Sequence, residues 1–178
     1  LFEANVGGGI PILRPLGSCL AANELEQITG ILNGTTNFIL TRMIQAGLTF
    51  DQALAEAQAN GYAEKDPSAD VDGHDACRKI CILADLAFGK QVDPALVPTE
   101  GIRGVTLADV DYAASKDYKI KLLGRALRQE EGRVCAFVAP HLVPGENPLS
   151  SVEDVFNAIS VTGNAIGEVM FYGRGAGK

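Results

Sequence analysis

The stretch from Glu64 to Lys79 constrains the fold more than any other part of this 178-residue sequence. Its sixteen residues hold five carboxylates, one histidine and three cations, and such a group of charges is costly to bury without partners. The segment 64–73 contains a proline and alternating acids, which predicts a structured loop. From about Asp72 to Phe88 the sequence predicts a helix whose core-facing stripe consists of Ala76, Ile80, Leu83, Ala84 and Ala87. A polar site is therefore expected where this loop meets the helix.

Asp75 and Lys79 lie four residues apart on that helix, so the carboxylate can orient the ammonium on one face. Asp72, three residues before Asp75, is expected to join the same face. An ordinary surface ion pair is the more common interpretation of this spacing and is worth only about 0.3 to 0.5 kcal/mol. The acid-rich loop just before the helix, which has no basic partner except Lys65, instead favours a functional site.

The remaining sequence predicts strands and helices in an α+β order within one domain. A short strand at 1–6, a helix kinked near Pro15 and a β-rich run at 25–33 come first. Further helices are expected at 34–46 before Gly47, after a capping box of Thr49 and Gln52, and at 106–117. Strands are expected at 118–129, 132–143 and 167–173. We interpret Lys116, Lys119 and Lys121 as lining a solvated strand edge.

Composition excludes several functional classes. The hydrophobic content of 47% and the mean hydropathy of +0.11 suit a globular domain with a real core. A net charge of -7, without a long cluster of Lys or Arg, argues against nucleic acid and favours a small charged metabolite. No apolar run of membrane-spanning length and no secretion signal stand out, so a cytoplasmic protein with no membrane partner is expected.

The four cysteines Cys19, Cys77, Cys81 and Cys135 show neither zinc-type spacing nor a disulfide framework, and we interpret them as buried free thiols. A sharper alternative makes Cys77 a nucleophile of the aldehyde-dehydrogenase kind, with His74 as its base. No other feature supports acyl chemistry, so packing is the favoured role of Cys77, and His74 is expected to be structural.

Three ordered motifs resemble homoserine dehydrogenase: EANVGGGIPI at 3–12, GILNGTTNFIL at 30–40 and GYAEKDPSADVDGHDACRK at 61–79. The resemblance continues to the final GRGAGK. It implies that residues 1–178 are the catalytic, substrate-binding and dimerisation domain, with a mixed β-sheet covered by helices, like the C-terminal domain of glyceraldehyde-3-phosphate dehydrogenase. An N-terminal NAD(P)-binding Rossmann domain and any C-terminal regulatory domain are expected outside this chain, since no strand-GxGxxG-helix unit is found here.

The resemblance also implies a reaction, the NAD(P)-dependent interconversion of L-homoserine and L-aspartate 4-semialdehyde in threonine, methionine and isoleucine biosynthesis. Lys79 matches the proton-transferring lysine of the family, and Asp75 would hold its ammonium in place. The resemblance also implies the substrate-binding residues. Glu64 would bind the amino group, and Gly34 and Thr35 would bind the carboxylate. Asp70 would contact the polar end of the substrate, and Tyr62 would line the same pocket. The residues alone leave two other roles open: Gly34 and Thr35 could form a plain helix cap, and Tyr62 could simply pack against its neighbours.

Cofactor and cation positions follow from the resemblance as well. The candidates for contact with the nucleotide are Gly173, Gly175 and Gly177. A monovalent cation, usually sodium in the family, would be bound mostly by backbone carbonyls of Glu3, Val6, Gly8 and Ile10. Without the resemblance, the same glycine-rich segment is interpreted as a strand-to-helix turn.

The family completes its active site with a second lysine from the nucleotide-binding domain, so this chain alone is expected to be inactive. A homodimer is expected, because the family's catalytic domains pair through their sheets. Two alternatives stay open: an amino-acid-binding module that senses homoserine without chemistry, and a chiefly structural dimerisation domain. Saturable binding of homoserine would separate these two, and activity with the N-terminal domain restored would separate the enzyme from both.

Overall fold

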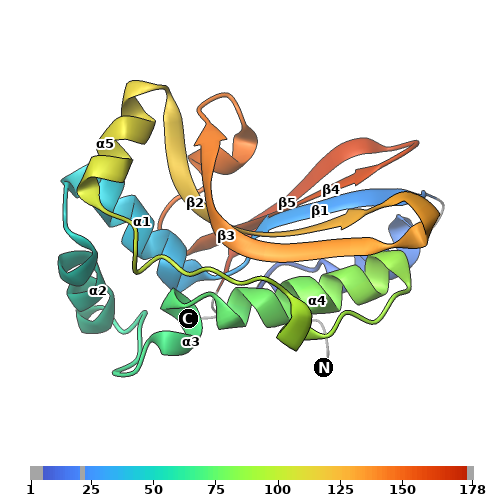
Figure 1. The fold of residues 1–178 in the computed structure, drawn as a ribbon, viewed down its shortest axis with the longest axis horizontal. Coiled ribbons are helices and arrows are strands. Elements are labelled where there is room, and N and C mark those ends of the chain that lie inside the picture. Colours follow the sequence, from blue (N-terminus) through green and yellow to red (C-terminus); the bar gives the residue numbers. More distant parts are fainter. Residues whose placement is uncertain (1–5, 21–22, 176–178) are drawn as a thin grey trace.

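The computed structural model describes residues 6–20 and 23–175, which form a five-stranded sheet with helices packed against it (Figure 1). The strand order is β3-β2-β1-β4-β5. The strands are β1 (Leu25–Ile31), β2 (Tyr118–Arg128), β3 (Val134–Pro144), β4 (Phe156–Gly163) and β5 (Gly167–Arg174). All four pairs of neighbouring strands are antiparallel, and an isolated bridge between Thr99 and Val138 adds a parallel contact. The predicted α+β class is confirmed, and the sheet is mixed only through that bridge.

The helices are α1 (Gly34–Ala46), α2 (Phe50–Ala59), α3 (Ser68–Val71), α4 (His74–Phe88) and α5 (Leu107–Ser115). Figure 1 shows α4 running along one face of the sheet, while the other four helices gather near one end of it. No helix within 6–20 and 23–175 is long and apolar enough to cross a membrane.

Several helix boundaries follow the predicted sequence signals. The capping box of Thr49 and Gln52 opens α2, and a second box of Thr106 and Asp109 opens α5. Gly47 and Gly89 end α1 and α4 with left-handed φ values of 63°, which residues with a Cβ adopt at a cost. These boundaries could be predicted because each depends on local backbone hydrogen bonds.

The main core lies between the sheet and the helices on the α4 side. The α4 stripe of Ala76, Ile80, Leu83 and Ala84 is buried there as predicted, while Ala87 is partly buried. A second cluster lies on the opposite face beneath the turn Pro148–Ser151. Its buried members are Ile31, Leu123, Val143, Leu149, Val152 and Ala158.

Other predicted boundaries were wrong. The helix expected from Asp72 begins at His74, because Gly73 adopts a left-handed φ of 84° and separates it from the short helix α3. Strand β4 was not predicted at all. The kinked helix near Pro15 is a π-helical turn over Pro15–Cys19. The expected strand at 1–6 lies almost wholly outside the described residues.

The cysteine prediction holds for two thiols. Cys77 and Cys81 are free and buried, but Cys135 is free and exposed on β3, so its predicted burial was wrong. The side chain of Cys19 lies outside the described part of the chain. Burial raises the pKa of the Cys81 thiol to about 12, and Cys77 lies beside it, one helical turn away. The Sγ of Cys77 faces the carbonyl of Pro94 at 3.7 Å, which fits a packing role.

The interpretation of the β2 lysines as a solvated edge was wrong. Strand β2 lies between β3 and β1, and Lys121 is fully buried. Its Nζ donates to the carbonyl of Val152 and, at 3.3 Å, to Oδ1 of Asn37. Lys119 pairs with Glu153 at 2.9 Å, and of the three lysines only Lys116 is exposed. The apolar neighbours of Lys121 in sequence place its position in the core.

Burial lowers the pKa of Lys121 from 10.5 to about 8, with the nearby charge of Lys119 acting in the same direction and Glu153 and Asp154 opposing it. Between these two pH values an unfolded chain holds a proton that the folded chain has released. The free energy of unfolding should therefore rise with pH across this window, by on the order of 3 kcal/mol at most.

Chemical denaturation of the protein containing this domain from pH 7 to 10 tests this prediction. Lys121→Met should lose this rise, whereas Lys116→Met, which removes an exposed cation, should keep it. Equal pH slopes for the wild type and Lys121→Met would contradict a titrating buried lysine.

Candidate active site

Asp75 and Lys79 form the centre of the candidate site at the start of α4. The Nζ of Lys79 lies 2.6 Å from Oδ2 of Asp75 and also donates to the carbonyl of Leu32 at 3.0 Å. Their side chains retain only 19% and 27% of their exposure. Because a second contact ties Lys79 to the end of β1, this pair differs from an ordinary surface pair on one helix.

Asn33 also belongs to this candidate site, and no motif in the sequence had placed it there. It caps α1, and its Oδ1 accepts from the amide of Thr36 at 2.9 Å. Its Nδ2 donates to Asp70 at 2.7 Å and to Asp75 at 2.8 Å. An Asn between a β-rich run and a helix signals an N-cap, but the two carboxylate contacts join segments about forty residues apart. One buried amide thus connects α1, α3 and α4.

Asp70 belongs to the short helix α3 and is half-buried. Burial raises its pKa above 3.8, the hydrogen bond from Asn33 opposes that rise, and the charges of Asp75 and Glu64 add to it. Glu64 itself is exposed, close enough to act on Asp70. Three carboxylates therefore face one region next to a single ammonium, which favours a ligand that carries a positive charge.

Tyr62, Thr35 and Gly34 lie around the first turn of α1. The hydroxyl of Thr35 donates to the carbonyl of Tyr62 at 2.7 Å, and the Tyr62 ring packs edge-on against Phe38 with centroids 5.0 Å apart. Gly34 is the first residue of α1, and a Cβ there would lie 2.8 Å from the carbonyl oxygen of Val155. The glycine thus permits close approach of the chain itself at the helix start.

Asp72 does not belong to this site, so its predicted place on the Asp75 face was wrong. It pairs with Arg103, whose second nitrogen lies 3.2 Å from Oδ2 of Asp72 and 3.3 Å from Oγ of Ser68. The expectation that the acidic loop has no basic partner except Lys65 was also wrong, because Arg103 pairs with Asp72. Arg103 is distant in sequence, and a pattern within 64–79 could not indicate it.

The glycine-rich turn near the start of the chain meets the end of β5. The amide of Gly9 donates to the carbonyl of Arg174 at 3.2 Å, and a Cβ on Gly8 would lie 1.9 Å from the carbonyl oxygen of Gly175. The amide of Gly175 donates to Val155 at 3.1 Å, the residue that contacts Gly34. The predicted cation turn, the predicted cofactor glycines and the start of α1 are therefore neighbours. Glu3 and Gly177 lie outside the described residues.

This turn offers backbone oxygens to an ion. Among the described residues no group of three or more His, Cys, Asp or Glu side chains could hold a metal. The carbonyls of Gly7 and Ile10 already accept from Ile10 at 3.1 Å and from Ile12 at 2.9 Å, respectively. A carbonyl has two lone pairs, so the carbonyls of Gly7 and Ile10 can accept a further contact beyond these hydrogen bonds.

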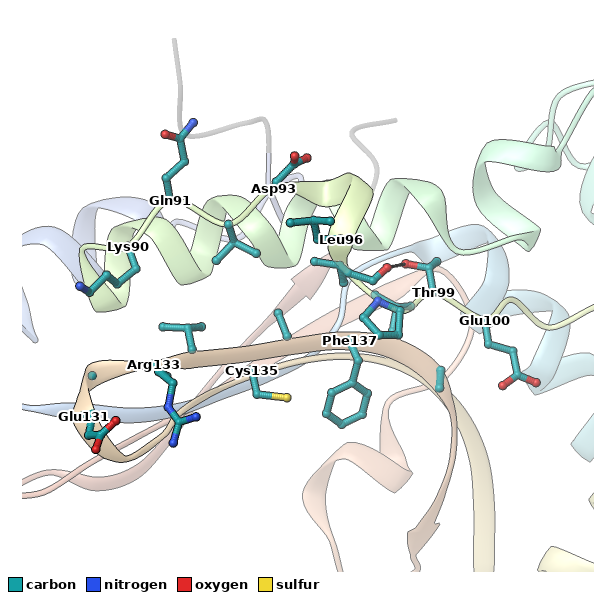
Figure 2. A pocket seen from close by; sticks show the side chains of 18 residues that line it. Lys90, Gln91, Asp93, Leu96, Thr99, Glu100, Glu131, Arg133, Cys135 and Phe137 are labelled. Atoms are coloured by element: carbon teal, nitrogen blue, oxygen red, sulfur yellow. Dashed lines mark hydrogen bonds between the residues drawn. The ribbon is translucent and has the colours of Figure 1, made fainter.

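A broad groove of about 1090 Å³ lies elsewhere, between the segment 90–100 and the first half of β3 (Figure 2). Leu96, 81% exposed, stands on the segment, and Cys135 and Phe137 project from β3. None of the predicted site residues lines this groove. Volume alone would favour it as a ligand site, but the hydrogen-bonded Lys79 and its carboxylates lie around the starts of α1 and α4.

The raised pKa of Asp70 generates a stability prediction. A carboxyl whose folded pKa lies above its ordinary 3.8 costs stability at neutral pH, and this cost disappears when the pH falls below 3.8. Asp70→Asn keeps the shape and an acceptor for Asn33, so it should raise the melting temperature at pH 7. The gain should shrink as the melts are moved to acid pH. A lower melting temperature of the variant at pH 7 would show that the ionised carboxylate is stabilising.

Comparisons with known proteins agree on one family. Residues 11–178 match the family model described as homoserine dehydrogenase. The chain is 51% identical to the homoserine dehydrogenase of Synechocystis sp. over 180 residues, covering 99% of this chain and 42% of that protein. The homoserine dehydrogenase structure from Thiobacillus denitrificans superposes with a TM-score of 0.96 at 45% identity, over 99% of this chain and 41% of that one.

A hyperthermophilic archaeal homoserine dehydrogenase mutant, solved in complex with NADPH, superposes with a TM-score of 0.81 at 34% identity. That match covers 98% of this chain and 49% of the archaeal one. The chain therefore spans about two fifths of the length of the curated Synechocystis relative and about half of the archaeal structure.

Proposed function

Because this chain belongs to the homoserine dehydrogenase family, we propose that the protein containing it interconverts L-homoserine and L-aspartate 4-semialdehyde by hydride transfer to or from NAD(P). The observation that carries the proposal is the ammonium of Lys79, held 2.6 Å from Asp75 and 3.0 Å from the Leu32 carbonyl. The archaeal relative solved with NADPH supports the cofactor class. Such a reaction belongs to the synthesis of threonine, methionine and isoleucine from aspartate.

Lys79 is suited to proton transfer because an ammonium has three donors and two are already used. The third can point at the substrate oxygen. In the reducing direction the ammonium gives a proton to the alkoxide-like oxygen, and in the oxidising direction the amine takes it back. Asp75 holds the Nζ of Lys79 in place and fixes its direction. NAD(P), when bound, supplies or accepts the hydride.

The substrate's two charged ends match two different surfaces. Glu64 and Asp70 provide carboxylates for the amino group of homoserine. The start of α1 provides the amides of Gly34 and Thr35 for the substrate carboxylate, since these amides have no partner inside the helix and form the positive end of its dipole. Tyr62 adds a half-exposed ring beside Thr35. This arrangement would hold the hydroxyl of homoserine near Lys79.

For the cofactor we propose contacts from Gly173 and Gly175, with Gly177 beyond the described residues. Gly175 has no room for a Cβ, which would lie 2.5 Å from the Asn157 side chain. The backbone of Gly175 therefore packs directly against its neighbours. A sodium ion bound by the carbonyls of Val6, Gly8 and Ile10, together with Glu3, would stiffen the same corner. A Rossmann domain of the parent protein would supply the main nucleotide contacts and a second lysine.

Replacing Lys79 tests the proposed chemistry. In the parent protein, homoserine-dependent formation of NAD(P)H should fall at least about a hundredfold in kcat for Lys79→Met, since the proton-transferring group is lost. Lys90→Met is the matched control, because it removes an exposed cation just beyond the other end of α4. An inactive parent that still binds homoserine would indicate a sensor built on this scaffold. An active Lys79→Met variant would remove Lys79 from the chemistry.

We also propose that the protein is a cytoplasmic homodimer that pairs through the open face of its sheet. On that face Arg125 lies 5.8 Å from the centre of the Phe137 ring, and its Nε is buried without a hydrogen-bond partner among the described residues. Glu168 lies on the same hollow of the sheet, so two copies could pair opposite charges.

Light scattering of the parent protein should give the mass of a dimer. Arg125→Glu should shift it towards the monomer, because two acidic side chains would then meet at the interface. A monomeric wild type would contradict this assignment.

A further inference from the structure

Lys121 is the buried charged group that the proposed chemistry does not use. With Asn37 and the segment 152–156 it forms a set of contacts that we call the α1 clamp. We propose that Lys121 is a positioning residue that holds the start of α1, through this clamp, where it can bind the substrate carboxylate. The inference rests on the proposed function and assigns to it a residue that never touches the substrate.

The clamp is built around Asn37. Its Oδ1 accepts from the Nζ of Lys121 at 3.3 Å, and its Nδ2 donates to the carbonyls of Val152 at 3.2 Å and Phe156 at 3.0 Å. Lys121 donates to the same Val152 carbonyl. One lysine thus binds both partners, the helix side chain and the segment that it contacts.

The segment 152–156 lies along one face of α1. It contacts Gly34 through the carbonyl of Val155, Asn37 as described, and Thr41, whose Oγ1 accepts from the amide of Asp154 at 3.0 Å. Positions 34, 37 and 41 share a helix face. Because the contacts span two turns, a shift of the segment moves the helix start as a rigid body.

Burying a lysine at this position is unfavourable, because a buried ammonium loses its hydration, whereas an apolar side chain does not. The stem of Lys121 runs on the strand face that it shares with Leu123, in the second hydrophobic cluster, where a methionine would pack. What methionine cannot do is donate to Val152 and Asn37. The directional contacts are therefore the distinguishing property of Lys121.

The clamp acts most directly on the α1 end of the site, because the Lys79 pair meets that end only through Asn33 and the Leu32 carbonyl, which follow directly on β1. Lys79 and Asp75 both belong to α4, so their 2.6 Å contact does not pass through Asn37. Gly34 and Thr35, by contrast, begin the helix that the clamp holds. Loss of Lys121 should therefore weaken binding of the substrate carboxylate and spare the proton-transfer step.

The experiment uses the parent protein and three variants: Lys121→Met, Asn37→Leu and the double variant. Lys121→Met should raise the KM for homoserine about tenfold, while kcat and the KM for NAD(P) stay within about threefold. The probe for the carboxylate is 3-aminopropan-1-ol, which is homoserine without that group. Its inhibition constant should be the same in wild type and Lys121→Met, because it makes no contact with the helix start. Lys116→Met, an exposed cation, is the control and should behave as wild type.

The double variant tests whether the two residues act through one contact. If they do, its KM for homoserine should be no higher than that of the worse single variant. An unchanged KM in Lys121→Met, or equal weakening of homoserine and 3-aminopropan-1-ol, would overturn the inference. If Lys121→Met does not fold, Asn37→Leu carries the same test. A wild type without activity on homoserine would instead refute the proposed function, so the two failures can be told apart.

Discussion

The side-chain amide of Asn33 is the contact on which the candidate site depends. It uses its oxygen to begin α1 and its nitrogen to bridge Asp70 and Asp75. Without a shared donor, two carboxylates in a half-buried region would repel each other, and the ammonium of Lys79 would have to compensate both. With it, Asp75 is left to orient Lys79, while burial keeps the pKa of Asp70 raised despite the opposing hydrogen bond from Asn33.

Under the proposed function, this arrangement separates two tasks that act on the same small molecule. The helix α4 holds the Lys79–Asp75 pair, proposed to transfer the proton, with a spacing set by one helical turn. The start of α1 is held from two sides, by Asn33 at the acidic cluster and by the α1 clamp at the sheet. Each end of a bifunctional substrate would therefore meet a surface with its own supporting contacts, and none of the residues proposed for either surface lines the broad groove beside β3.

Local signals in the sequence predicted α1, α2, α5 and most strands, because caps, glycine stops and alternation act within a few residues. The Asp75–Lys79 pair was found for the same reason. Asn33, Arg103 and Lys121 were missed or misread, since their partners are distant in sequence and a lysine in a strand gives no sign of a buried carbonyl partner. Strand β4 is rich in small and polar residues, and the alternation of Ile159, Ser160, Val161 and Thr162 within it was overlooked.

The contact between Gly8 and Gly175 also bears on how such a domain can sit inside a larger protein. The turn before the first helical segment and the end of the last strand touch backbone to backbone, with a Gly9–Arg174 hydrogen bond across them. A host domain joined to both would meet a single narrow stem. With such a closed stem, one domain can be inserted into a loop of another without disturbing either core. The inserted domain can then also be exchanged as a unit.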